Sequence, residues 1–159
     1  MEMPLYLHFI FAFIATMGYS VFFNVPRKQL SYCGLTGGIG WVIYIFLNNH
    51  NLFNPVSANF FAAFVVTLVS EKLARLLKKP AILFIIPGII PLVPGLGMYK
   101  TMLNFVQGDY NLAIATGTEA ILISGAIALG LMVTTSIYTS MNRCKSKLLR
   151  RNKKDTKTN

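Results

Sequence analysis

Five apolar runs, each long enough to cross a lipid bilayer, dominate the sequence. The hydrocarbon core of a bilayer is about 30 Å thick, which takes roughly 20 helical residues to cross. Backbone groups in lipid must be hydrogen-bonded within the protein, so such runs fold as helices. The sequence therefore predicts an all-α, polytopic helical membrane protein with about five transmembrane helices. They are Leu5–Phe23, Ser31–Leu47, Ser57–Leu77, Ala81–Tyr99 and Leu112–Met141.

Composition agrees with this class and excludes others. Hydrophobic residues make up 54% of the chain and charged residues only 13%, which is unlike a soluble globular domain. The net charge of +10 does not indicate nucleic-acid binding, because the basic residues lie between apolar runs and in the tail. The N-terminal run lacks the basic start and the small-residue cleavage site of a signal peptide, so we interpret it as a retained span.

The basic residues also predict how the chain is organised and oriented. Residues 1–141 form the expected five-span transmembrane domain, and residues 142–159 form a basic tail polar enough to be disordered. Fourteen of the fifteen Lys and Arg residues fall in the first connection, at the third connection or in this tail, and Lys100 is the exception. In a five-span protein those three segments share one side. The positive-inside rule then places the N-terminus outside and the C-terminus in the cytoplasm.

The fourth apolar run contains an interruption, IIPGIIPLVPGLGMYKT, at residues 85–101. Pro87, Pro91 and Pro94 each lack a backbone N–H, and each ring clashes with the preceding helical turn. Counted from Lys79, Pro91 is about 18 Å along a helix and near mid-depth. Irregular backbone at that depth is tolerated only where protein or a water-filled cavity surrounds it. We predict one helix broken by Pro and Gly between residues 87 and 97.

Broken helices of this kind form substrate sites in secondary transporters. In this interpretation Pro91 and Pro94 end one half-helix, and the N–H groups from Gly95 to Gly97 begin another, directing partial positive charge into a cavity. Lys100, about one turn further on, adds a full positive charge, so the segment suits a carboxylate. The alternative is a kinked structural helix whose freed carbonyls are capped by neighbouring groups.

Two carboxylates are candidates for a gate or for proton coupling. Glu119 lies about 36 Å along a helix from Arg143, which places it at the outer mouth unless strong tilt draws it inward. It is therefore a gate candidate first and a titrating group second. Glu71 has Arg75 four residues on, so an ion pair near the cytoplasmic end explains it, with proton coupling as the alternative.

The remaining motifs favour packing over catalysis. The glycines of CGLTGGIGW, from Gly34 to Gly40, allow close approach of two helices, or alternatively expose backbone to a ligand. Cys33 is interpreted as a small packing residue beside them. The sequence has no pair of membrane-embedded aspartates and no G-x-S-x-G motif, and His8 and His50 have no metal-like partners. We therefore predict no enzyme activity, no catalytic residue, no metal site and no cofactor.

Two segments carry a family resemblance. FNVPRKQLSYCGLTGGIGW and PGIIPLVPGLGMYKTM resemble the threonine/serine exporter (ThrE-type) family, and specifically its C-terminal half, which also occurs as a small separate membrane subunit (YjjB-like). The P-x-x-P-G-x-x-x-Y core is carried here by Pro91, Pro94, Gly95 and Tyr99, and Tyr99 thereby joins the residues expected to line the path. The resemblance covers roughly residues 5–141.

The resemblance implies a subunit of a secondary transporter in a bacterial inner membrane. Such a transporter exports small amino acids (threonine or serine) or small carboxylates such as succinate, and its broken helix lines the path. It also implies a partner, a second membrane subunit equivalent to the N-terminal half of the family. The alternative is an accessory or scaffold subunit that does not transport. The sequence leaves open the substrate, the coupling ion and whether the chain forms a homo-oligomer.

Overall fold

The computed structural model describes residues 4–49 and 53–155, with side chains as far as Met141. Throughout this described part the regular elements are helices, which agrees with the all-α prediction. In chain order they are α1 (Leu5–Phe22), η1 (Arg27–Gln29), α2 (Leu30–Asn49), α3 (Pro55–Leu77), α4 (Ile82–Ile89), η2 (Ile90–Leu92), α5 (Gly95–Val106) and α6 (Tyr110–Asp155).

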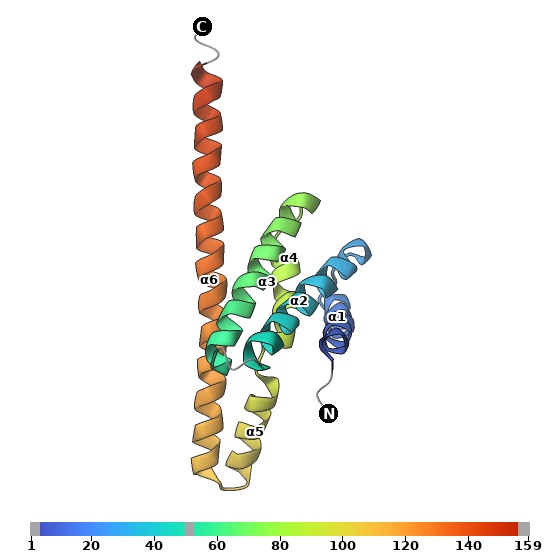
Figure 1. Ribbon diagram of the computed structural model, residues 1–159, viewed down its shortest axis with the longest axis vertical. Helices are drawn as coiled ribbons and strands as arrows, with labels where there is room; N and C mark the ends of the chain where they lie inside the picture. Colours follow the sequence, from blue (N-terminus) through green and yellow to red (C-terminus); the bar gives the residue numbers. More distant parts are fainter. Residues whose placement is uncertain (1–3, 50–52, 156–159) are drawn as a thin grey trace.

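Helices α1 to α4 form a bundle, and α5 lies beyond its lower end (Figure 1). The chain passes back and forth through the bundle, leaves it at the end of η2 and continues along α5 before it turns into α6. Helix α6 has 46 residues, about 69 Å at 1.5 Å per residue, and is far longer than a bilayer core is thick. It runs beside both α5 and α3, so it joins the α5 hairpin to the bundle.

The centre of the bundle is α3, which contacts α2, α4 and α6. Its buried face consists mainly of small side chains, which let these helices approach closely in lipid. On the facing side of α6, a Cβ added at Gly130 would lie 2.8 Å from the backbone oxygen of Phe60. Apolar residues from three elements complete this core: Val66 from α3, Leu92 from η2 and Ile127 from α6.

The glycines of α2 pack against α1 and α3, as the first of the two interpretations expected. A Cβ at Gly34 would lie 2.8 Å from the Met17 side chain, and one at Gly37 would overlap Thr16. Gly34 and Gly37 are both buried, and so are Gly38 and Gly40. These glycines therefore allow close contact between helices and do not form a surface open to a ligand.

The structure agrees with a polytopic helical membrane protein, although fewer than five segments qualify as spans by length and composition alone. In the described part of the chain, three helical segments are long and apolar enough to cross a membrane, Leu5–Phe22, Arg27–Asn49 and Tyr110–Met141. A fourth is added if the bent pair Ile82–Leu92 and Gly95–Val106 counts as one span. The segment missing from this set is α3, which lies at the bundle centre and carries Glu71, Lys72 and Arg75 near its end.

Two predicted boundaries are also corrected. The fourth run was expected to end at Tyr99, but α5 continues to Val106 because residues such as Thr101 pack onto α6. The last helix starts at Tyr110 instead of Leu112 and runs to Asp155. The division at Met141 and the disorder of the tail stay predictions, since the side chains beyond Met141, including Cys144, lie outside those described. His50 also lies outside the described residues.

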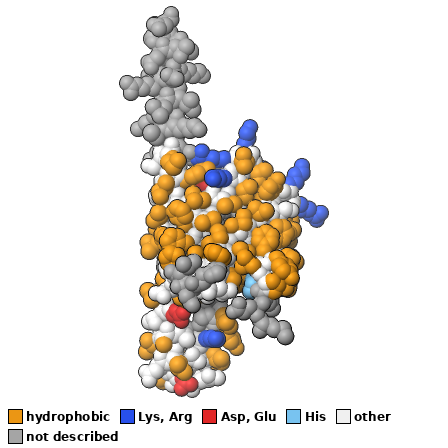
Figure 2. Space-filling view, viewed as in Figure 1, with side chains coloured by type: hydrophobic (Ala, Val, Ile, Leu, Met, Phe, Trp, Pro, Cys, Tyr) orange, Lys and Arg blue, Asp and Glu red, His pale blue; other side chains and the backbone are white. Residues whose placement is uncertain are grey.

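Basic side chains gather at one end of the bundle. Arg27 and Lys28 lie in η1, and Lys78 and Lys79 follow α3, so the two connections with most basic residues lie at the same end. Figure 2 shows these charges at the upper end, above a surface that is largely hydrophobic. This is the arrangement on which the predicted orientation depends.

The contact between α1 and α2 gives a test of the fold. We expect Gly37→Val to lower the free energy of unfolding by about 1–3 kcal/mol, because its side chain must displace Thr16 in a closely packed interface. Gly18→Val is the matched control, since a Cβ at Gly18 meets nothing within 4 Å. Thermal unfolding in detergent measures both variants. Equal stability of the two would contradict the proposed contact.

Candidate functional site

The break in the fourth apolar run lies between α4 and α5. The axes of Ile82–Leu92 and Gly95–Val106 are bent by 51°, which confirms the interruption predicted between residues 87 and 97. Pro87 lies inside α4, Pro91 lies in η2, and Pro94 immediately precedes α5. Each of these prolines leaves a carbonyl one turn earlier without its usual helical donor.

One side chain of α2, the thiol of Cys33, supplies a donor to a carbonyl that α4 leaves free. Pro87 cannot donate to the carbonyl of Leu83, and the thiol of Cys33 lies 3.5 Å from that oxygen. The Thr36 hydroxyl lies 3.5 Å from the carbonyl oxygen of Phe84 and 2.7 Å from that of Cys33. Cys33 and Thr36 are both fully buried. Cys33 therefore satisfies freed backbone, in addition to the packing role that the sequence suggested.

The backbone itself closes the rest of the break with tight turns. The N–H of Ile90 donates to the carbonyl oxygen of Pro87. The N–H of Val93 donates to the carbonyl oxygen of Ile90 at 3.2 Å. The N–H of Gly95 donates a hydrogen bond to the carbonyl oxygen of Val93 at 2.7 Å. Helix α5 begins at Gly95 and has no side-chain acceptor at its N-cap. The following N–H groups carry the partial positive charge of a helix start.

The six residues predicted to bind substrate or line its path lie along this break and the first turns of α5. A Cβ at Gly95 meets nothing within 4 Å, and one at Gly97 would lie 3.6 Å from Ala120 on α6. The six lie on one continuous segment that is partly open to its surroundings, and their function stays a prediction. Three of the six are half-buried, Pro91, Pro94 and Gly97. The other three are exposed, Gly95, Tyr99 and Lys100.

Glu119 lies on α6 at the level where α5 begins. Its neighbour Ala120 faces Gly97, and Glu119 is exposed. Its charge contributes to the electrostatic environment of Tyr44 on α2. Tyr44 also contacts Trp41, with ring centroids 5.3 Å apart. The fold therefore brings this carboxylate, two aromatic residues of α2 and the helix break to one region, although its roles in gating or proton coupling stay predictions.

Glu71 has a different environment from the one expected. The anticipated ion pair with Arg75 is not seen among the described side chains. The guanidinium of Arg75 lies over the ring of Tyr138, 4.3 Å from its centroid, and so joins α3 to α6 by a cation–π contact. Glu71 itself is half-buried. The aromatic face of Tyr138, 63 residues away in the sequence, could not be anticipated from the i,i+4 spacing.

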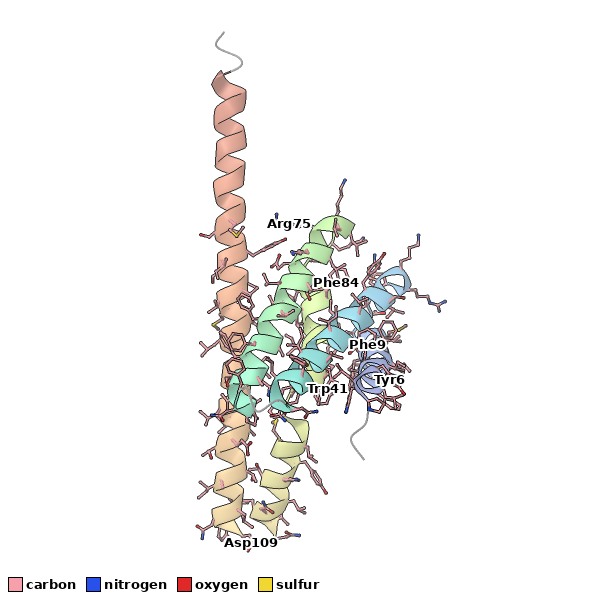
Figure 3. The ribbon with its side chains drawn as sticks, viewed as in Figure 1. Tyr6, Phe9, Trp41, Arg75, Phe84 and Asp109 are labelled. Carbon is pink, nitrogen blue, oxygen red and sulfur yellow. The ribbon has the colours of Figure 1, made fainter. Side chains whose placement is uncertain are left out.

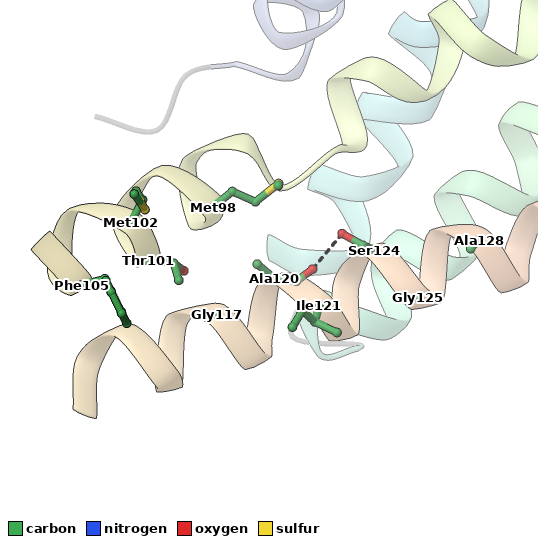
Figure 4. Close-up of a pocket in the computed structure, with 10 residues that line it drawn as sticks. All are labelled: Met98, Thr101, Met102, Phe105, Gly117, Ala120, Ile121, Ser124, Gly125 and Ala128. Carbon is green, nitrogen blue, oxygen red and sulfur yellow. Dashed lines mark hydrogen bonds between the residues drawn. The ribbon is translucent and has the colours of Figure 1, made fainter. Parts of the chain in front are cut away.

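A groove opens between α5 and α6, with a volume of about 820 Å³. Its walls on α5 are Met98, Met102 and Phe105, and its floor on α6 consists mostly of small residues (Figure 4). Where the two helices meet, the hydroxyls of Thr101 and Thr116 are 3.1 Å apart. None of the six predicted path residues lines this groove, and the sequence analysis missed it. The residues that line it on α6 are Gly117, Ala120, Ile121, Ser124, Gly125 and Ala128.

Buried hydroxyl groups form a second feature that the sequence analysis missed. Thr16 and Ser20 on α1 bond to carbonyls one turn earlier at 2.7 Å, and Ser20 lies beside Cys33. On α3, Ser70 is fully buried, and its hydroxyl has no hydrogen-bond partner among the described residues. The available signal was Ser and Thr at helical spacing within apolar runs, such as Thr67 and Ser70. Figure 3 shows the side chains of the bundle helices, with Phe84 of α4 and Phe9 of α1 labelled.

Apolar helices around a broken helix, with a donor that satisfies a freed carbonyl, define a polytopic helical membrane protein. The chain belongs to the threonine/serine exporter (ThrE) family, whose model matches residues 8–137. This family is described as one of threonine/serine exporters. The resemblance noted in the sequence is thereby confirmed.

One curated relative is an uncharacterized protein of Haemophilus influenzae, 33% identical over 138 residues. The alignment covers 81% of this chain and 46% of the relative, so the chain spans about half the length of the relative it matches. No solved structure is similar to the chain.

The contact between Cys33 and Leu83 gives a test of how the break is stabilised. Pro87→Ala restores the N–H that can donate to the Leu83 carbonyl, so the thiol becomes redundant. We expect Cys33→Ala to cost about 1 kcal/mol more in the natural chain than in the Pro87→Ala variant. A double-mutant cycle on unfolding in detergent measures the difference. The same loss in both backgrounds would mean that the thiol only fills space.

Proposed function

We propose that the chain is a subunit of a secondary transporter that exports small amino acids, threonine or serine, or small carboxylates such as succinate. The observation that carries this proposal is the break between α4 and α5, bent by 51° in a chain of this exporter family. In this proposal the segment from Pro91 to Lys100 lines the path. Half-helix starts of this kind bind the carboxylates of substrates in other secondary transporters.

The charges near the break suit a zwitterionic substrate. The first turn of α5 has no side-chain cap, so its N–H groups are available to a carboxylate. Lys100, one turn further, is exposed and adds positive charge. Glu119 is the residue before Ala120, which faces Gly97, and in this proposal its carboxylate accepts hydrogen bonds from the ammonium group. An amino acid at this break would thus meet opposite charges on α5 and α6.

The proposal includes a second membrane subunit, equivalent to the N-terminal half of the family. This chain spans 46% of the relative from Haemophilus influenzae, so a protein of about the same size again is needed to match that relative. Helix α5 buries none of its residues within the chain, which supports an incomplete assembly. In a bacterial inner membrane the basic end would face the cytoplasm, with the N-terminus outside.

One observation favours the accessory or scaffold alternative. Cys33 and Thr36 approach the carbonyls of Leu83 and Phe84 to within 3.5 Å, and a capped kink needs no substrate. That observation concerns α4 only, since the start of α5 has no such cap. Variants at the start of α5 therefore distinguish the two functions.

Gly95→Val tests the path directly. A side chain there meets nothing within 4 Å in the chain, so we expect normal membrane insertion and stability together with loss of export, because the side chain covers the backbone that a substrate would approach. Gly18→Val, at another open glycine, should export normally. Pro94→Ala should also abolish export by straightening the helix. Export of labelled threonine, serine and succinate from cells is measured at matched protein levels.

Lys100→Gln should reduce export of an anionic substrate more than that of a zwitterionic one, since it removes one positive charge and leaves the helix start intact. Its exposed side chain makes the fold insensitive to the change. Normal export by the Gly95, Pro94 and Lys100 variants together would mean that the prolines only shape a kink.

Reporter fusions test the orientation. We expect a reporter that is active only in the cytoplasm to be active when it is fused after Asn159. A reporter that is active only outside should be active when it is fused before Met1, because nearly all basic residues lie at one end. The reverse pattern of activity would contradict the proposed topology.

A further inference from the structure

Helix α5 lies outside the bundle and presents a large apolar surface. It buries none of its residues, and its packing within the chain is against α6. Large side chains on it are exposed, among them Met98 and Phe105, and Ile121 faces them from α6. The apolar surface of α5 that α6 leaves uncovered is therefore free to contact lipid or a partner.

The groove between α5 and α6 has the shape of a site for another helix. Its floor repeats small residues at helical spacing, Ala120, Ser124 and Ala128, so a second backbone could approach α6 closely. Met98 and Met102 form a flexible wall that can adapt to the surface of a partner. Its residues carry no formal charge, and the volume of about 820 Å³ is large enough for several side chains.

We propose that this groove binds an apolar transmembrane helix of the second subunit. The inference rests on the proposed function, which requires such a subunit, and it adds where that subunit binds. The H. influenzae relative is more than twice as long as the part of it that matches this chain, since the match covers 46%. The rest of that relative is long enough to supply a helix that fills such a groove.

Two other occupants fit less well. In a two-fold dimer each copy presents the same surface to the other, and two concave grooves facing one another leave a space unfilled. A lipid chain can enter the groove, but it makes no use of closely spaced small residues, which serve backbone-to-backbone contact between helices. The apolar helix uses both the small floor and the adaptable wall.

Site-specific photocrosslinking in native membranes tests the proposal. A photoreactive amino acid replaces Ser124 or Ala128 in the full-length chain, and Ala115, exposed on α6 but outside the groove lining, is the control position. We expect adducts from the two groove positions, and few from position 115, with a membrane protein identified by mass spectrometry. Its sequence must match the part of the relative that this chain does not cover.

Bulky variants give an independent measurement. We expect Ala128→Phe to weaken co-purification of that protein roughly tenfold, as one overfilled contact does, whereas Ala115→Phe leaves it unchanged. Adducts of twice the mass of this chain, or adducts with phospholipid alone, would overturn the proposal.

If export proceeds and the partner crosslinks only elsewhere, the groove is not its site although the proposed function stands. If the partner occupies the groove and no substrate is exported, the docking site stands and the proposed function fails.

Discussion

Every other feature of this protein depends on how a chain with three prolines in eight residues keeps its backbone hydrogen-bonded inside a membrane. Water is absent from the hydrocarbon core, so each freed carbonyl needs a donor from the protein or must face a cavity. In the first half of the break the thiol of Cys33 lies 3.5 Å from the freed carbonyl oxygen of Leu83. The thiol can reach α4 only because α2 lies against it, and Gly88 of α4 allows this close approach, since a Cβ there would lie 2.9 Å from the Thr36 hydroxyl oxygen.

The same requirement divides the molecule into two unlike parts. In the bundle, small residues bring α1, α2, α3 and α4 together and bury a set of hydroxyl groups. Past Pro94 the chain leaves this environment, and α5 is joined to α6 by the approach of Thr101 to Thr116 and by the contact of Gly97 with Ala120. The break is therefore a boundary between a well-packed bundle and a hairpin that buries little apolar surface.

The sequence predicted the local features well and the tertiary ones poorly. Apolar runs and the prolines at 87, 91 and 94 determined where helices form and where one breaks, because those effects act within a few residues. The end of α5 at Val106 was not predictable in this way, since it depends on packing against α6. The cap of Leu83 by Cys33 joins residues 50 apart, and the contact of Arg75 with Tyr138 joins residues 63 apart. A single sequence contains no local signal for either pairing.

The position of Glu119 shows why the two parts of the molecule must act together if the chain transports a substrate. Its carboxylate belongs to α6, the helix that runs along both the bundle and the α5 hairpin. Its charge contributes to the environment of Tyr44 on the bundle side, and Gly97 lies beside the next residue, Ala120, on the hairpin side. A change in the angle between α4 and α5 would move Gly97 relative to Ala120 while Tyr44 stayed with the core that contains Leu92. The surroundings of α6 next to Glu119 therefore depend on the geometry of the break, and this dependence is why the gating role of Glu119 is worth testing although it stays a prediction.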